Sequence, residues 1–165
     1  MTRSARQANR VSDETILYVV VRDRNGRVAH KAVGSALIQA DRDAGITTFA
    51  LRKGIEPLTA FLVDSPAQAE SAKRVLADLG DVDFDDRDFE PRWFQPARCV
   101  ESVSALLDCG REGRGRLSEA VRQELEELRQ VLAETERRSC AFYLVEVPSG
   151  GDLGFAGPAL DGGAG

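Results

Sequence analysis

The chain has 165 residues, of which 42% are hydrophobic and 30% charged, and its net charge is −5. These values are typical of a soluble globular protein, and the length is enough for one domain with its own hydrophobic core. No apolar stretch approaches the ~20 residues that span a bilayer, and the basic N-terminus lacks the apolar segment of a secretory signal. We therefore expect a cytoplasmic protein that does not contact membranes.

The acidic charge is concentrated in residues 78–90. This segment contains six aspartates and Glu90 but only one basic residue, Arg87, so it carries −6 and leaves +1 for the rest of the chain. Such an asymmetry affects the choice of partner more than the fold. Because an acidic segment repels a polyanion, and because the clustered arginines lie in two short segments (three each in 3–10 and 111–116), we do not expect nucleic-acid binding.

The N-terminal third predicts an antiparallel meander. A run of β-branched and aromatic residues predicts the first strand, and Asn25-Gly26 predicts a two-residue hairpin turn after it. A helix over 32–40 is the alternative to the second strand, although Gly34 weakens that helix. The three strands are expected at residues 15–22, 27–38 and 46–51.

Residues 58–86 predict a β-α-β unit. An apolar strand at 58–63 leads to Ser65, which has proline directly after it and glutamine three residues later, the pattern of a capping box. Apolar residues then recur with helical spacing over 66–79, and a glycine ends the helix. The alternating residues 81–85 predict a second strand, parallel to the first, with its aspartates in water.

The C-terminal half predicts two more helices and one strand. The helices are expected over 97–109 and 118–138, and the second has a narrow apolar seam that lies on the sheet or pairs with another chain. The run AFYLVEV at 141–147 is almost continuously apolar, which predicts an interior strand of the sheet. The glycine-rich residues 148–165 predict a disordered tail.

Together these elements predict an α/β fold on the border of α+β. We expect a single mixed sheet of about five or six strands, with an antiparallel meander, a β-α-β unit and three helices. The globular domain spans residues 14–147, between a mobile arm at 1–13 and the tail at 148–165.

The acidic segment resembles a calcium loop only at its start. Asp81-x-Asp83-x-Asp85 has the spacing of an EF-hand loop, which also requires glycine at position six and glutamate at position twelve. Those positions hold Asp86 and Arg92. We therefore expect no metal here, and interpret the segment as an acidic strand face or a docking surface for a basic partner.

A second chemical hypothesis comes from the order of the elements. Three antiparallel strands, followed by a strand that ends at Asp64 and leads directly into a helix, resemble the ribonuclease H fold over about half of the chain. The resemblance implies a metal-dependent phosphodiesterase or nuclease that uses strand-end carboxylates. Two features depart from it: Asp23 lies at the tip of the first strand, and a helix has no room between Leu51 and Leu58.

Other catalytic and cofactor patterns are missing from the sequence. The cysteines Cys99, Cys109 and Cys140 are odd in number and lack CxxC spacing, so they predict neither a disulfide framework nor a zinc site. His30 is the only histidine, and no nucleophile elbow or phosphate loop occurs. We expect no cofactor, and the balance of these patterns is against an enzyme.

The remaining hypothesis is a non-catalytic interaction or regulatory module. It would bind a protein partner, or a second copy of the chain, through the acidic segment, the long helix or an aromatic loop at 90–95. Tryptophan and arginine are enriched in interface hot spots, but the aromatic pair instead closes one end of the sheet if it is buried. The expected partner-binding residues are Asp81, Asp83, Asp85, Asp86, Trp93, Phe94 and Arg98.

Overall fold

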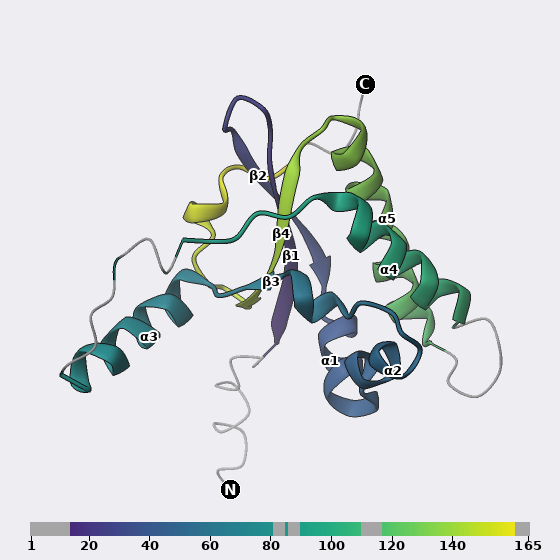
Figure 1. Cartoon of the computed structure of the whole chain (residues 1–165), viewed down its shortest axis with the longest axis horizontal. Coiled ribbons are helices and arrows are strands. Elements are labelled where there is room, and N and C mark those ends of the chain that lie inside the picture. The colour runs from purple at the N-terminus through teal and green to yellow at the C-terminus, as the bar shows by residue number, and fades with distance from the viewer. Residues whose placement is uncertain (1–13, 81–84, 86–89, 110–116, 161–165) are drawn as a thin grey trace, which may run out of the picture.

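The computed structural model describes residues 14–80, 85, 90–109 and 117–160 (Figure 1). In this part of the chain one sheet of four strands is combined with five α-helices and two short 3₁₀-helices. In chain order the elements are β1 (Thr15–Arg22), β2 (Val28–Gly34), α1 (Ala36–Ala44), α2 (Ile46–Arg52), η1 (Leu58–Phe61), β3 (Leu62–Val63), α3 (Pro66–Asp78), α4 (Pro96–Cys109), α5 (Glu119–Arg137), β4 (Ala141–Pro148) and η3 (Gly154–Ala156). The mixed α/β class is confirmed, whereas the described residues contain fewer strands and more helices than predicted.

The sheet has the order β2-β1-β4-β3. β1 is antiparallel to both β2 and β4, and β3 pairs in parallel with β4. The prediction that residues 141–147 form an interior strand is confirmed, because β4 lies between two neighbours. This position explains why β4 is apolar on both faces.

The first hairpin turn differs from the prediction. β1 and β2 pair through Arg22 and Val28, so five residues connect them instead of two. Gly26 has a φ of +80°, but Asn25 does not have the positive φ that a primed two-residue turn requires. Asp23 holds the loop instead, because its Oδ1 accepts from the backbone N–H groups of Asn25 at 2.8 Å and Arg27 at 2.9 Å.

The predicted third strand at 46–51 is wrong, because these residues form α2. The predicted second strand ends at Gly34 instead of Ile38, and α1 starts two residues later. Gly45, with a φ of +67°, ends α1 and precedes α2. Asp41 then accepts from the backbone N–H of Thr47 at 2.6 Å and from its hydroxyl at 3.0 Å. This local capping favours helix where the β-branched residues alone favour strand.

The predicted fourth strand at 58–63 is mostly η1, and only its last two residues form β3. The parallel neighbour of β3 is β4. The predicted strand at 81–85 lies outside the described residues except for Asp85, which is in neither helix nor strand. The β-α-β unit therefore stays a prediction, while its helix is present as α3.

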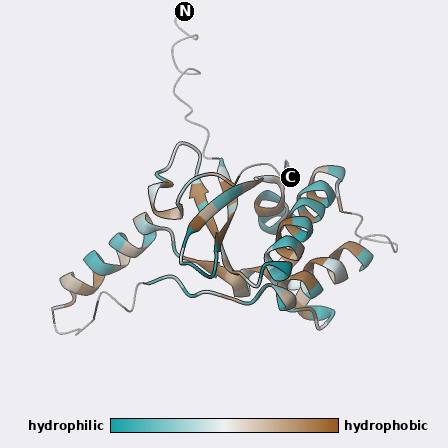
Figure 2. Cartoon of the chain, turned by 90° about the horizontal axis from the view of Figure 1, so that it is seen from above, coloured by the Kyte–Doolittle hydropathy of each residue, from teal (hydrophilic) through white to brown (hydrophobic). Residues whose placement is uncertain are grey.

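Helices cover one face of the sheet. α1, α2, α4 and α5 lie on the same side (Figure 1), and they share a core with Leu17 and Val19 of β1 and with Phe142 and Leu144 of β4. The hydrophobic residues concentrate on the strands and on the inner sides of these helices (Figure 2). Among the described residues, none of the helices has the length and apolar character needed to cross a bilayer.

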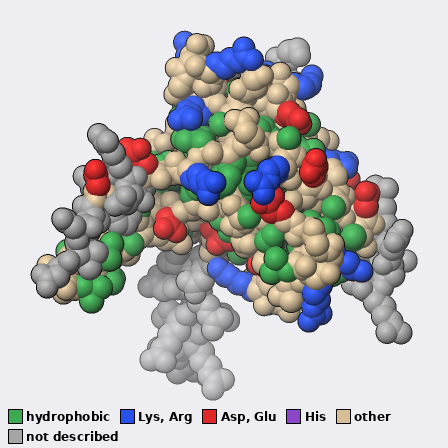
Figure 3. All heavy atoms as spheres, viewed as in Figure 1, with side chains coloured by type: hydrophobic (Ala, Val, Ile, Leu, Met, Phe, Trp, Pro, Cys, Tyr) green, Lys and Arg blue, Asp and Glu red, His purple; other side chains and the backbone are tan. Residues whose placement is uncertain are grey.

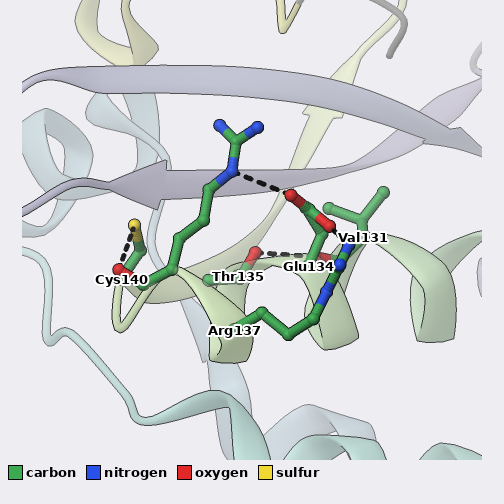
Figure 4. A network of polar contacts seen from close by, with 6 residues as sticks. Val131, Glu134, Thr135, Arg137 and Cys140 are labelled. Atoms are coloured by element: carbon green, nitrogen blue, oxygen red, sulfur yellow. Dashed lines mark hydrogen bonds and ion pairs between the residues drawn. The ribbon is translucent and has the colours of Figure 1, made fainter. Parts of the chain in front are cut away.

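The end of α5 is joined to β4 by a compact polar turn (Figure 4). The buried Thr135 donates its hydroxyl to the carbonyl of Val131 at 2.7 Å, and its own carbonyl accepts from the N–H of Cys140 at 2.9 Å. Glu134 forms ion pairs with Arg137 and with Arg138. The hydrogen bond from Cys140 to Thr135 links the last turn of α5 to the residue that precedes β4, whereas the ion pairs of Glu134 lie within the end of the helix.

The opposite face of the sheet is covered by irregular chain. Val20, Tyr143 and Val145 pack there against the buried Ala156 of η3 and against Leu153. Residues 149–160, part of the segment predicted to be disordered, thus make defined contacts with the sheet. Their path ends on β2. There the backbone N–H of His30 donates to the carbonyl of Pro158 at 3.0 Å, and the carbonyl of His30 accepts from the backbone N–H of Leu160 at 2.7 Å.

Candidate functional site

The helix α3 starts with a complete capping box. The Oγ of Ser65 accepts from the backbone N–H of Gln68 at 3.3 Å, and the side-chain oxygen of Gln68 accepts from the N–H of Ser65 at 2.7 Å. Pro66 occupies the first helical turn, where its missing N–H costs nothing. This part of the prediction is confirmed, and it shows that α3 is specified by its own local sequence.

None of the residues of α3 is buried. The helix projects away from the sheet in two perpendicular views (Figures 1 and 2). Val75 is 60% exposed and Leu79 is 66% exposed, and hydrophobic atoms are visible at the surface over this helix (Figure 3). We define the exposed α3 stripe as Ala69, Ala72, Val75, Leu76 and Leu79. Val75 and Leu79 are exposed, whereas Ala69, Ala72 and Leu76 are half-buried. The exposed apolar area that marks a candidate interaction surface therefore centres on Val75 and Leu79.

Charged residues flank the stripe. Lys73 lies 3.4 Å from Glu70 in an exposed ion pair, and Arg74 and Asp78 are exposed. In the sequence the acidic segment 78–90 follows directly. Of the predicted acidic partner residues, Asp81, Asp83 and Asp86 lie outside the described residues, and Asp85 is exposed.

The aromatic loop is largely used by the fold itself. Phe94 exchanges two backbone hydrogen bonds with Phe142, at 2.8 and 3.0 Å, and its ring meets the ring of Phe61 edge to face. The half-buried Trp93 packs against Tyr143 with ring centroids 4.7 Å apart, and the guanidinium of Arg22 lies 4.4 Å from the tryptophan ring. The loop therefore covers the edge of β4 next to β3, which agrees with the interpretation that it closes the sheet.

Two further predicted contacts have structural roles. Arg98 is exposed at the start of α4 and forms an ion pair with Glu56. The apolar seam of α5 is buried, as shown by Leu125, Leu128 and Leu132, so it lies in the core instead of pairing with another chain. Neither group adds to the exposed α3 stripe.

The candidate catalytic residues are not brought together. Asp64 is exposed between β3 and α3, and within the described ranges no three histidine, cysteine, aspartate or glutamate residues could hold a metal ion. The Nδ1 of His30 lies 2.9 Å from the carbonyl oxygen of Gly157 and holds the C-terminal segment. Cys99 is buried, and this burial, with a smaller contribution from Glu56, raises the pKa of its thiol.

One feature has no counterpart in the sequence predictions. A cleft of about 50 Å³ opens between the sheet and α1, α2, α4 and η1. Nine of its lining residues are aliphatic, and the others are Asp41, Thr47, Thr59 and Glu146. The one signal in the sequence is Glu146, a charged residue within an otherwise apolar strand.

Comparisons of the chain with models of protein families, with curated proteins and with solved structures find no significant match.

Proposed function

We propose that the chain is a non-catalytic interaction module and that its exposed α3 stripe binds a protein partner. The observation that supports this is a helix with a complete capping box and an apolar stripe, none of whose residues is buried. The described part of the acidic segment, Asp78, Asp85 and Glu90, is exposed and lies next to the helix in the sequence. A complementary partner therefore carries an apolar surface bordered by lysine or arginine.

The expected energies are modest. Full burial of a valine or leucine side chain contributes about 1.5–3 kcal/mol, so covering the exposed parts of Val75 and Leu79 contributes about 2–4 kcal/mol together. A micromolar complex requires about 8 kcal/mol. The remainder must come from the half-buried residues of the stripe and from attraction between the acidic segment and a basic partner. Binding should therefore weaken as the salt concentration rises.

A pair of synthetic peptides tests the partner chemistry. The first has leucines in a helical stripe with lysines elsewhere, and the second has glutamate at every lysine position. We expect fluorescence anisotropy to detect binding of the lysine peptide only. Combined Val75→Ser and Leu79→Ser should weaken it about tenfold or more, as should combined Asp83→Ala and Asp85→Ala, without loss of folding.

The matched control is Leu51→Ser, because this leucine is 62% exposed on a different helix. Equal binding of both peptides, or an unchanged affinity after substitution of Val75 and Leu79, would refute the proposal. Sedimentation of the chain alone tests whether the partner is a second copy of the chain. A dimer that dissociates when Val75 and Leu79 are both replaced by serine would identify another copy as the partner.

A further inference from the structure

The cleft between the sheet and the helical layer combines apolar walls with carboxylates. Its aliphatic lining comes from β1, β3, β4, α1, α2, α4 and η1, and no lysine, arginine or histidine among the described residues lines it. The two charged side chains in the lining, Asp41 and Glu146, are both acidic. A small site with this lining is complementary to a ligand that has an aliphatic body and a positive charge.

The two carboxylates differ in their bonding. Both oxygens of Asp41 accept from Thr47, at 2.6 Å from its N–H and 3.0 Å from its hydroxyl, so Asp41 caps α2. The Glu146 side chain makes no hydrogen bond or ion pair with any residue in the described part of the chain, and it is half-buried. Of the two, Glu146 is the one free to bind a cation.

The position of Glu146 on β4 directs it towards the cleft. It pairs with Leu17 of β1, and it lies two residues after Leu144, whose side chain belongs to the core under the helices. Because side chains alternate along a strand, Glu146 shares the helix-covered face with Leu144. A carboxylate placed between aliphatic side chains loses hydration, and a bound cation compensates for that loss.

The volume limits the size of the ligand. One ordered water occupies about 10–15 Å³ on this measure, so the space of about 50 Å³ holds a few methylene-sized groups. A drug-sized ligand needs several hundred Å³. We propose that the cleft binds a short aliphatic ammonium ion, with its alkyl chain among the leucines and its ammonium group at the carboxylate of Glu146.

This site is separate from the exposed α3 stripe, so either proposal can fail without the other. The test is an NMR titration of the full chain with three probes at equal ionic strength: butylammonium, butan-1-ol and ammonium chloride. We expect butylammonium to shift the amides of residues that line the cleft, with an affinity about tenfold or more above that of butanol, as a charge-assisted hydrogen bond implies. Ammonium alone should not shift them.

Two variants and one control separate the contribution of the charge from that of the available volume. Glu146→Gln should remove the preference for butylammonium over butanol, whereas Glu14→Gln, a carboxylate outside the lining, should keep it. Thr59→Ile places a larger side chain at the exposed rim of the cleft and leaves the core unchanged. It should weaken the binding of both butylammonium and butan-1-ol. Equal affinity for the two probes, shifts confined to other regions, or a preference that survives Glu146→Gln would overturn the proposal.

Discussion

Glu124 of α5 caps a helix that lies far away in the sequence, and its removal gives the sharpest stability prediction. Its two carboxylate oxygens accept from the backbone N–H groups of Ala36 at 2.8 Å and Leu37 at 2.7 Å, at the start of α1. Ser35, in the N-cap position, makes no side-chain capping bond and donates its hydroxyl to Glu14 instead. α1 therefore depends on α5 for its N-terminal cap.

The magnitude follows from the geometry. Loss of a helix cap costs about 0.5–2 kcal/mol, and two hydrogen bonds to a charged acceptor would contribute about 3–6 kcal/mol together. Because Ala36 and Glu124 are only half-buried, water replaces part of what is lost. We therefore expect Glu124→Ala to lower the free energy of unfolding by about 2 kcal/mol, and Glu124→Gln, which keeps one acceptor oxygen, by about half as much.

Urea unfolding measures both variants, with an unchanged m-value as the sign that only stability has changed. Glu127→Ala is the matched control, because Glu127 is exposed on the same helix and forms none of the capping bonds; it should change stability by less than about 0.5 kcal/mol. If Glu124→Ala were as mild as this control, the capping argument would be wrong.

A double-mutant cycle with Gly34 sharpens the test. Gly34 has a φ of +143°, and a Cβ added there would lie 2.1 Å from the Oε1 of Glu124. Gly34→Ala should therefore displace the capping carboxylate as well as strain the backbone. It should cost less in the Glu124→Ala background, with an interaction energy of about 0.5 kcal/mol or more. Additive effects would contradict the close approach.

Three other predictions concern the C-terminal segment and two buried groups. A Cβ at Gly157, where φ is +72°, would lie 2.0 Å from the carbonyl oxygen of Val28, so Gly157→Ala should release the segment from β2 and speed hydrogen exchange at the amides of His30 and Leu160; unchanged exchange would count against this contact. Because burial raises the pKa of the Cys99 thiol and Cys140 is also buried, a thiol reagent at mildly alkaline pH should modify the half-buried Cys109 first, and Cys109→Ser should remove that fast phase. Burial also raises the pKa of the Tyr143 phenol above its ordinary value of 10.0; the folded chain then holds this proton more tightly than the unfolded chain, so stability should fall as the pH rises through about 10. Tyr143→Phe should reduce this alkaline loss of stability in urea titrations, and an identical loss would argue against the assignment.

Sequence patterns predicted the elements whose specification is local. The capping box at Ser65, the serine that starts α5 and the apolar run of β4 each act within a few residues, and all three are present. The seam of α5 also predicted its buried face. These signals depend on hydrogen bonds and periodicity that the chain carries regardless of its tertiary contacts.

The errors came from side-chain bonds and packing that strand propensity does not capture, some of them local and some between distant residues. Residues 46–51 have β-branched character, but Asp41 caps them as a helix, and Ala50 is buried in the core. α1 receives its cap from Glu124, which is 88 residues from Ala36, so no local pattern could reveal its start. Tertiary packing overrides weak strand propensity in such places. The cleft is likewise assembled from separate elements, and only Glu146 hinted at it.

The arrangement of the two sheet faces explains why α3 is available for binding. In the described part of the chain, four helices cover one face and the C-terminal segment with Trp93 covers the other, so these residues close the core without α3. Most helices in proteins are stabilised by packing, and an isolated helix of about 12–15 residues is marginal in water. α3 has 13 residues and none of them is buried, so its capping box supplies the local stabilisation that packing supplies elsewhere. A partner that covers Val75 and Leu79 would add the missing packing, which couples the stability of α3 to binding.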